Sequence, residues 1–194
     1  MYSIEQLKET FKNQSDGIRV VLLIHRSKEG GANNKFKRHL RKIITTNSEE
    51  FFKAIKELKE IKDNDERPLR IYASCNNRDL NKAIRLFKEQ QLATDYDDEE
   101  KLSSFYLDIK NRFISCLMNK ACRNEKNFLF DLDDCDDRSF HSIYNILEKQ
   151  TEIVNYYQTK SGYHIITRPF NYFKEINKDI EDTIHTDSLM LIDY

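Results

Sequence analysis

The chain has 194 residues, of which 39% are hydrophobic, and its formal net charge is −1 at pH 7. This length predicts one domain, or two small lobes that share a core. No apolar run approaches the roughly 20 residues that cross a bilayer, and the first residues do not resemble a signal peptide, so we expect a cytoplasmic protein without a membrane partner. The four cysteines form no C-x-x-C pair, which indicates reduced thiols.

The first third of the chain is expected to fold as a helix followed by a basic β-hairpin. Ser3 and Gln6 form a capping box for a helix that ends near Lys12. Two strand-like runs, 18–25 and 38–46, flank a glycine-containing reversal. Residues 19–42 carry eight Lys or Arg against one acid, a local net charge of +7, which is typical of either a phosphate-binding surface or a solvated face.

Helices and strands alternate through the rest of the chain. Asn47 and Asp79 are placed to cap two helices, and each helix has an apolar stripe at helical spacing. The remaining expected elements are a strand over 69–74, a long helix over 102–117, a strand over 128–133, a helix around 140–147, a hairpin centred on Gly162 and a last strand over 188–192.

The segment 127–137 has the most distinctive chemistry in the sequence. An apolar strand ends in alternating carboxylates, and Asp131 and Asp133 share one face because side chains alternate along a strand. Two like charges this close require protons or a cation to neutralise them. The alternative is a solvated acidic turn after a buried strand.

A second motif lies in the tight turn between the strand-like runs 153–157 and 163–167. Lys160, Ser161 and His164, with the backbone of Gly162, place a cation, a hydroxyl and an imidazole around one turn, which suits phosphate oxygens. An ordinary Ser-Gly hairpin with a structural histidine is the alternative. A turn this short cannot join parallel strands, so the sheet is expected to be at least partly antiparallel.

Together these motifs resemble the archaeo-eukaryotic primase superfamily, and in particular its small phage- and plasmid-encoded primase-polymerases. That family has an acid-x-acid strand, then a serine-and-histidine hairpin, then a hydrophobic strand that bears a third acid. Asp187, which precedes the last strand, resembles the third acid, and Asp193 is the alternative. The hairpin here has one more residue between Ser161 and His164 than some members have.

The resemblance implies a fold and a function. The expected fold is α+β, with an N-terminal α/β module (approximately 1–92) and an RNA-recognition-motif-like, mainly antiparallel sheet with flanking helices (100–194) in one domain. The expected function is metal-dependent nucleotidyl transfer, either adding nucleotides to a 3'-hydroxyl or starting primers, with Mg²⁺ or Mn²⁺ as cofactor. The implied partners are nucleoside triphosphates, a DNA template or primer and a helicase or other replication proteins.

The resemblance also implies roles for individual residues. Asp131, Asp133 and Asp187 are the expected catalytic metal ligands. The expected nucleotide-binding residues are Lys160, Ser161, Gly162 and His164, with Asn76 and Arg78 at the end of an earlier strand. The residues expected to contact nucleic acid are Arg26, Lys35, Lys37, Arg38 and Arg41.

Two other functions fit parts of the same sequence. Residues 130–135 also resemble the nucleophile motif of haloacid-dehalogenase-type phosphatases, in which Asp131 would be phosphorylated. Cys135 stands where those enzymes favour Thr or Val, only 63 residues follow Asp131, and the tight hairpin does not suit their parallel sheet. The other alternative is a catalytically inert nucleic-acid-binding or regulatory module on a primase-like core.

Overall fold

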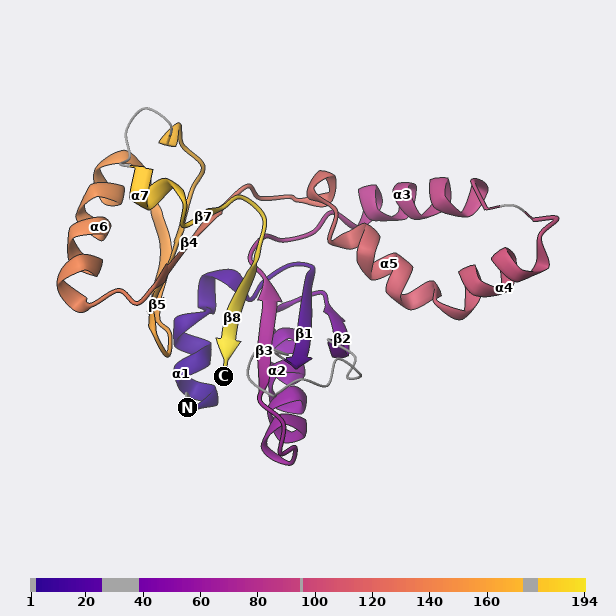
Figure 1. Cartoon of the computed structure of the whole chain (residues 1–194), viewed down its shortest axis with the longest axis horizontal. Coiled ribbons are helices and arrows are strands. Elements are labelled where there is room, and N and C mark those ends of the chain that lie inside the picture. The colour runs from indigo at the N-terminus through magenta and orange to yellow at the C-terminus, as the bar shows by residue number, and fades with distance from the viewer. Residues whose placement is uncertain (1–2, 26–38, 95, 173–177) are drawn as a thin grey trace.

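The computed structural model describes residues 3–25, 39–94, 96–172 and 178–194, and it has the expected α+β class (Figure 1). Its strands form two four-stranded sheets, and every strand pair in both sheets is antiparallel. A helical arm extends from this two-sheet body on the right of Figure 1.

The first sheet contains the expected hairpin and has the strand order β2-β1-β3-β8. Its strands are β1 (Arg19–His25), β2 (His39–Thr45), β3 (Leu69–Ser74) and β8 (Leu189–Asp193). Helix α1 (Ile4–Thr10) begins at the Ser3 capping box, a 3-10 turn follows at Lys12–Gln14, and α2 (Ser48–Asp63) begins at Asn47. Both caps form as predicted, because each side-chain oxygen accepts a backbone N–H of the first turn.

Alternate residues of β1 belong to two different hydrophobic clusters. Val21 and Leu23 pack with α1 and α2, whereas Val20 and Leu22 pack with side chains of the arm. This first sheet is therefore covered by apolar side chains on both faces, which explains why β1 is buried along its whole length.

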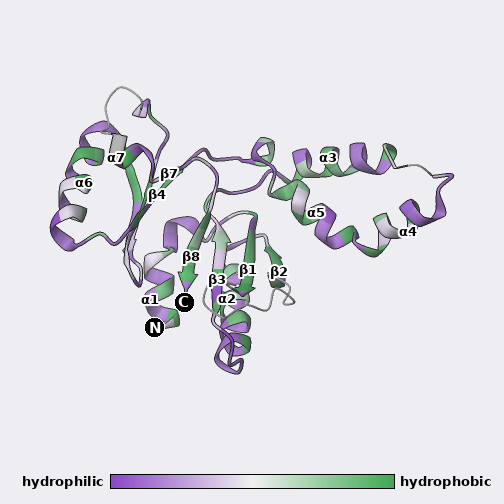
Figure 2. Cartoon of the chain, in the orientation of Figure 1, coloured by the Kyte–Doolittle hydropathy of each residue, from purple (hydrophilic) through white to green (hydrophobic). Residues whose placement is uncertain are grey.

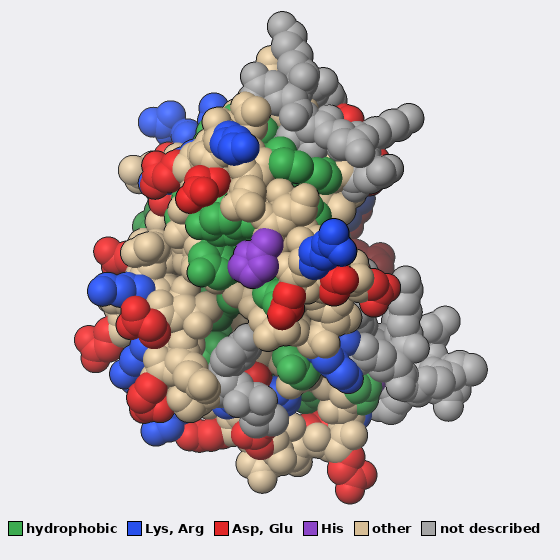
Figure 3. All heavy atoms as spheres, turned by 90° about the vertical axis from the view of Figure 1, so that its left-hand side faces the viewer, with side chains coloured by type: hydrophobic (Ala, Val, Ile, Leu, Met, Phe, Trp, Pro, Cys, Tyr) green, Lys and Arg blue, Asp and Glu red, His purple; other side chains and the backbone are tan. Residues whose placement is uncertain are grey.

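The second sheet follows the β-α-β-β-α-β order of an RNA-recognition-motif-like sheet. Its elements are β4 (Phe128–Asp133), α6 (Asp137–Gln150), β5 (Ile153–Gln158), β6 (Gly162–Thr167), α7 (Lys178–Glu181) and β7 (Ile184–His185), and the strand order is β5-β6-β4-β7. One face packs on α6 through Phe130, Leu132 and Phe140. On the outer side of this lobe, side chains of both charge signs are interspersed, as on an ordinary solvated surface (Figure 3).

The last strand joins the first sheet, although it follows the second in sequence. β8 pairs with β3, and the short β7 takes the edge position beside β4. Met190 and Ile192 enter the same hydrophobic cluster as Val21 and Leu23. The range 100–194 therefore contributes strands to both sheets.

The two sheets also share this cluster directly. Leu129 of β4, Tyr157 of β5 and Ile166 of β6 belong to it together with residues of the first sheet. Phe11, just after α1, meets Tyr157 edge-on with ring centroids 4.8 Å apart. The resulting core fixes the second sheet against the first.

The arm consists of α3 (Leu80–Leu92), α4 (Glu99–Leu107) and α5 (Ile109–Leu117), with a 3-10 turn at Lys120–Cys122. The sequence predicts one long helix over 102–117, but the structure has two helices with a break at Asp108, where ψ is 17°. Hydrophobic and hydrophilic segments alternate along the arm helices, and the start of α4 at the far end of the arm is hydrophilic (Figure 2).

The cysteines are thiols in this structure. All four cysteines are free, and burial raises the pKa of the Cys75 thiol to about 12. Within the described residues, no helix combines the length and the apolar character that crossing a bilayer requires.

Candidate functional site

The alternation of β4 places its two carboxylates on the face opposite α6. Phe130 and Leu132 are buried against α6, while Asp131 is partly exposed and Asp133 is exposed. β4 pairs with β6 so that Asp131 lies opposite His164 and Asp133 lies opposite Gly162. The predicted acidic face and the predicted hairpin are thus neighbours in one sheet.

The hairpin lies so close to β4 that only glycine fits at its first strand position. A Cβ on Gly162 would lie 1.9 Å from the carbonyl oxygen of Leu132, a backbone atom that cannot move aside cheaply. The Thr159 N–H donates to the Gly162 carbonyl at 2.8 Å and closes the turn. This close approach brings the side chains of the turn within reach of the acids.

Each carboxylate accepts a hydrogen bond from one hairpin side chain. The Ser161 hydroxyl donates to Asp133 Oδ1 at 3.2 Å, and His164 Nε2 lies 3.0 Å from Asp131 Oδ1. An ionised carboxylate can only accept, so Nε2 is assigned the proton, and in that neutral tautomer Nδ1 accepts from the Tyr157 hydroxyl at 2.8 Å. Tyr157 belongs to the shared core, and it therefore fixes the orientation of the imidazole that holds Asp131.

These residues form one wall of a cleft of about 490 Å³ between the two sheets. The opposite wall comes from the first sheet, where alternate residues of β3 and β8 face the cleft. The residues of the hairpin wall are Asp131, Asp133, Asp134, Thr159, Lys160, Ser161 and His164, and those of the opposite wall are Arg70, Tyr72, Leu189 and Leu191.

Sequence reasoning missed the opposite wall and the support from Tyr157. The strand Leu69–Ser74 alternates buried residues with the partly exposed Arg70 and Tyr72, so their common face is encoded in the sequence. This face meets the hairpin of the other sheet only because the two sheets share one core. The packing of the two sheets cannot be predicted from a local sequence pattern.

The carboxylates fit a hard divalent cation that the substrate helps to coordinate. In the described residues, no group of three or more His, Cys, Asp or Glu side chains is arranged to hold a metal ion. Mg²⁺, however, is usually bound through one or two carboxylates together with substrate phosphates, and Asp131 and Asp133 supply two such oxygen donors at the cleft.

The acids that follow Asp133 have separate structural roles. Asp134 has a positive φ of 54°, which turns the chain away from β4. Asp136 caps α6 by accepting the Ser139 N–H at 2.7 Å, and Asp137 accepts from the Tyr163 hydroxyl at 2.6 Å. Asp136 and Asp137 do not line the cleft.

Three expected site residues lie elsewhere, in a buried polar junction. Arg78 and Asp187 form a bidentate ion pair at 2.9 and 3.0 Å, with side chains 0% and 3% exposed. The Asn76 side chain bonds both backbone groups of Asn127 and thereby ties the end of β3 to the start of β4. None of the three lines the cleft, because each is occupied in joining loops of the two sheets.

The alternative third acid is also engaged elsewhere. Asp193 is 1% exposed and pairs with Lys62 at 2.5 Å and with Lys59 at 3.4 Å, both from α2. The structure therefore brings Asp131 and Asp133 together at the cleft and leaves Asp187 and Asp193 in ion pairs outside it.

Only one of the basic residues expected to contact nucleic acid can be placed. Arg41 lies on β2 and pairs with Glu57 of α2 at 3.2 Å, with about half of each side chain exposed. Arg26, Lys35, Lys37 and Arg38 lie outside the described residues. Arg41 does not line the cleft.

No protein-family model, curated protein or solved structure matches this chain.

The Arg78–Asp187 pair provides a test of whether these residues are structural. Removing one partner leaves a buried charge uncompensated, so Asp187→Asn is expected to lower the free energy of unfolding by roughly 3–5 kcal/mol. The measurement is urea denaturation. The double variant Arg78→Met, Asp187→Leu is the matched control and should recover much of that loss. A variant of unchanged stability would contradict the structural role.

The Asp136 cap predicts a local pH dependence. Hydrogen bonds from Ser139 lower the pKa of Asp136 below its ordinary value of 3.8. Because the pKa of Asp136 is lower in the folded than in the unfolded protein, its ionised carboxylate stabilises the fold at a pH above the unfolded-state pKa. This stabilisation is lost as the pH falls through the folded-state pKa. Asn also caps helices but does not titrate. The Tm advantage of wild type over Asp136→Asn should therefore shrink as the pH falls from about 5. A Tm difference that stays constant with pH would contradict the role of the ionised Asp136 carboxylate as the cap.

Proposed function

We propose that this protein is a metal-dependent nucleotidyltransferase of the primase-polymerase kind. The observation that carries the proposal is the convergence of two segments about 30 residues apart in sequence on one cleft. Asp131 and Asp133 supply anionic oxygens, and Lys160 supplies a cation on the same wall. A site that pairs metal-binding carboxylates with a free ammonium suits a cation-bound triphosphate.

A bound Mg²⁺ or Mn²⁺ would neutralise phosphate charge and activate the attacking 3'-hydroxyl. Asp131 and Asp133 would hold it. His164 acts on this reaction through Asp131, because its contact with Oδ1 fixes the orientation of that carboxylate. Ser161 orients Asp133 in the same way. These two hairpin residues are therefore positioning residues in this proposal.

Lys160 is the hairpin side chain best suited to contact phosphate. It is exposed at the rim of the cleft, and it makes no hydrogen bond or ion pair with the part of the chain that the structure describes. An ammonium on a flexible stem can follow a triphosphate as it binds. The opposite wall, with the Tyr72 ring and two leucines, suits the sugar and base of the same nucleotide.

The strand pairing around Asp131 bears on the phosphatase alternative. β4 pairs antiparallel with both β6 and β7, whereas a haloacid-dehalogenase-type nucleophile follows a strand of a parallel sheet. The cleft geometry thus favours nucleotidyl transfer. The proposal includes a DNA template or primer, replication partners such as a helicase, and a cytoplasmic location, where nucleoside triphosphates are present.

The decisive experiment measures nucleotide incorporation on a primed DNA template with Mg²⁺ or Mn²⁺ and either ribo- or deoxynucleoside triphosphates. The double variant Asp131→Asn, Asp133→Asn should lower the rate by about 100-fold or more, because metal assistance provides several kcal/mol of transition-state stabilisation. Chelation with EDTA should abolish incorporation by wild type.

Asp136→Asn is the matched control, since it removes a carboxylate from the same acidic segment but outside the cleft, and it should retain activity. Wild-type protein that binds DNA but incorporates nothing under any of these conditions would support an inert binding module instead. Phosphatase activity that needs no nucleic acid and is lost in Asp131→Asn would support the phosphatase alternative.

A second prediction concerns Lys160. If its ammonium contacts phosphate, Lys160→Ala should raise the KM for nucleotide by roughly 10- to 100-fold, as expected for loss of a charge-assisted hydrogen bond. Lys160→Arg should retain most of the affinity. The matched control is Lys149→Ala, which removes an exposed lysine of α6 outside the cleft. Steady-state kinetics on the primed template gives kcat and the KM for nucleotide. An unchanged KM in Lys160→Ala would discredit the phosphate contact.

A further inference from the structure

The wall of the cleft that faces the hairpin carries a cation, Arg70. Arg70 and Tyr72 lie on the same face of β3, because side chains alternate along a strand, and both line the cleft. Tyr72 lies opposite Leu191 of β8, and Ser74 lies opposite Leu189. Along this wall, an apolar part made by Tyr72 and the two leucines is therefore followed by Arg70.

The junction between Asn76 and Asn127 shows which ends of the two walls correspond. The Asn76 side chain bonds both backbone groups of Asn127, so the end of β3 adjoins the start of β4. Arg70 lies six residues before Asn76, and Asp133 lies six residues after Asn127. Because Arg70 and Asp133 line the same cleft, both belong to the end of it that is away from this junction.

Lys160 lies at the same end of the cleft, on the hairpin wall. It is in the turn that follows β5, and the neighbouring Ser161 hydroxyl donates to Asp133 at 3.2 Å. Lys160 and Arg70 thus flank the Asp133 end of the cleft from its two walls. Two cations on opposite sides of a carboxylate pair that suits a divalent metal can neutralise a chain of phosphates from both sides.

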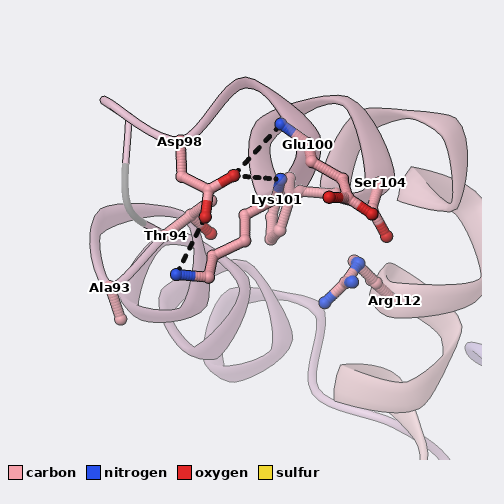
Figure 4. A pocket seen from close by; sticks show the side chains of 8 residues that line it. Ala93, Thr94, Asp98, Glu100, Lys101, Ser104 and Arg112 are labelled. Atoms are coloured by element: carbon pink, nitrogen blue, oxygen red, sulfur yellow. Dashed lines mark hydrogen bonds and ion pairs between the residues drawn. The ribbon is translucent and has the colours of Figure 1, made fainter.

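The larger hollow of about 700 Å³, on the arm, has a different chemistry (Figure 4). Asp98 caps α4 there by accepting the backbone N–H groups of Glu100 and Lys101 at 3.1 and 3.0 Å, and it also pairs with the Lys101 ammonium at 3.0 Å. The two carboxylates that share one strand face at the cleft have no counterpart among the described residues that line this hollow. A phosphate chain that binds with a divalent cation is therefore better suited to the cleft.

We infer that Arg70 binds the phosphate chain of the nucleotide together with Lys160, and that it makes the site selective for triphosphates over monophosphates. The base and sugar would lie over Tyr72 and the two leucines, and the β- and γ-phosphates would lie between the two cations. A guanidinium can hold two phosphate oxygens at once, which an ammonium cannot. The inference rests on the proposed function, because it takes a nucleotide as the occupant of the cleft.

The test measures equilibrium binding of a fluorescent deoxyadenosine triphosphate with Mg²⁺ and without primer, and its displacement by unlabelled deoxyadenosine triphosphate or monophosphate. Arg70→Gln should weaken triphosphate binding by roughly 10- to 100-fold and leave monophosphate binding within about twofold, as expected for loss of a charge-assisted hydrogen bond to the outer phosphates. Arg70→Lys should lose an intermediate amount, since it keeps the charge without the planar fork.

Two further measurements separate a phosphate contact from a structural role. Arg85→Gln is the matched control, because Arg85 is an exposed arginine of α3 outside the cleft, and it should bind both nucleotides like wild type. If Arg70 and Lys160 hold one phosphate chain, the double variant Arg70→Gln, Lys160→Ala should lose less affinity than the product of the two single losses, because contacts to one ligand are coupled.

Equal losses of triphosphate and monophosphate binding in Arg70→Gln would overturn the inference. A loss confined to a labelled single-stranded oligonucleotide, measured in parallel, would also overturn it and would assign Arg70 to the template. Failure of the proposed function has a different signature, in which wild type incorporates nothing on a primed template while selective triphosphate binding still depends on Arg70. Intact incorporation with unchanged triphosphate binding in Arg70→Gln would remove the inference alone.

Discussion

The candidate site depends on the register between β4 and β6. This pairing sets Asp131 opposite His164 and Asp133 opposite Gly162, so that each carboxylate meets a donor from the hairpin. A slip of one residue would turn both acids toward the α6 core and expose the apolar residues of β4. The missing side chain of Gly162 allows the two strands to approach in this register, since a Cβ there would overlap the Leu132 carbonyl.

The cleft has a second wall because the two sheets share one core. The Tyr157 ring packs in that core, and the Tyr157 hydroxyl orients His164. The packing of the core therefore helps to fix the geometry of the site. The last strand, β8, returns to the first sheet and carries two leucines to the cleft. The buried Arg78–Asp187 pair, just before that strand, joins the loops of the two sheets, and its bidentate geometry gives directional specificity at the junction.

The structure separates two surfaces of different chemistry. The cleft between the sheets gathers carboxylates with a lysine, and its His164 is oriented by a hydrogen bond to the buried Tyr157. The end of the arm instead exposes leucine and tyrosine side chains beside acidic residues, and its hollow belongs to the arm helices alone.

The sequence by itself determined the α+β class, the caps at Ser3, Asn47 and Asp79, an acidic strand and a tight hairpin. These features are local, because periodicity, capping and turn chemistry act over a few residues. Only the tertiary structure decided that Asp187 pairs with Arg78, that β8 joins the first sheet, and that Tyr72 lines the same cleft as the acids. Each of those outcomes depends on which distant surfaces are buried together, and burial is a property of the whole core rather than of any segment.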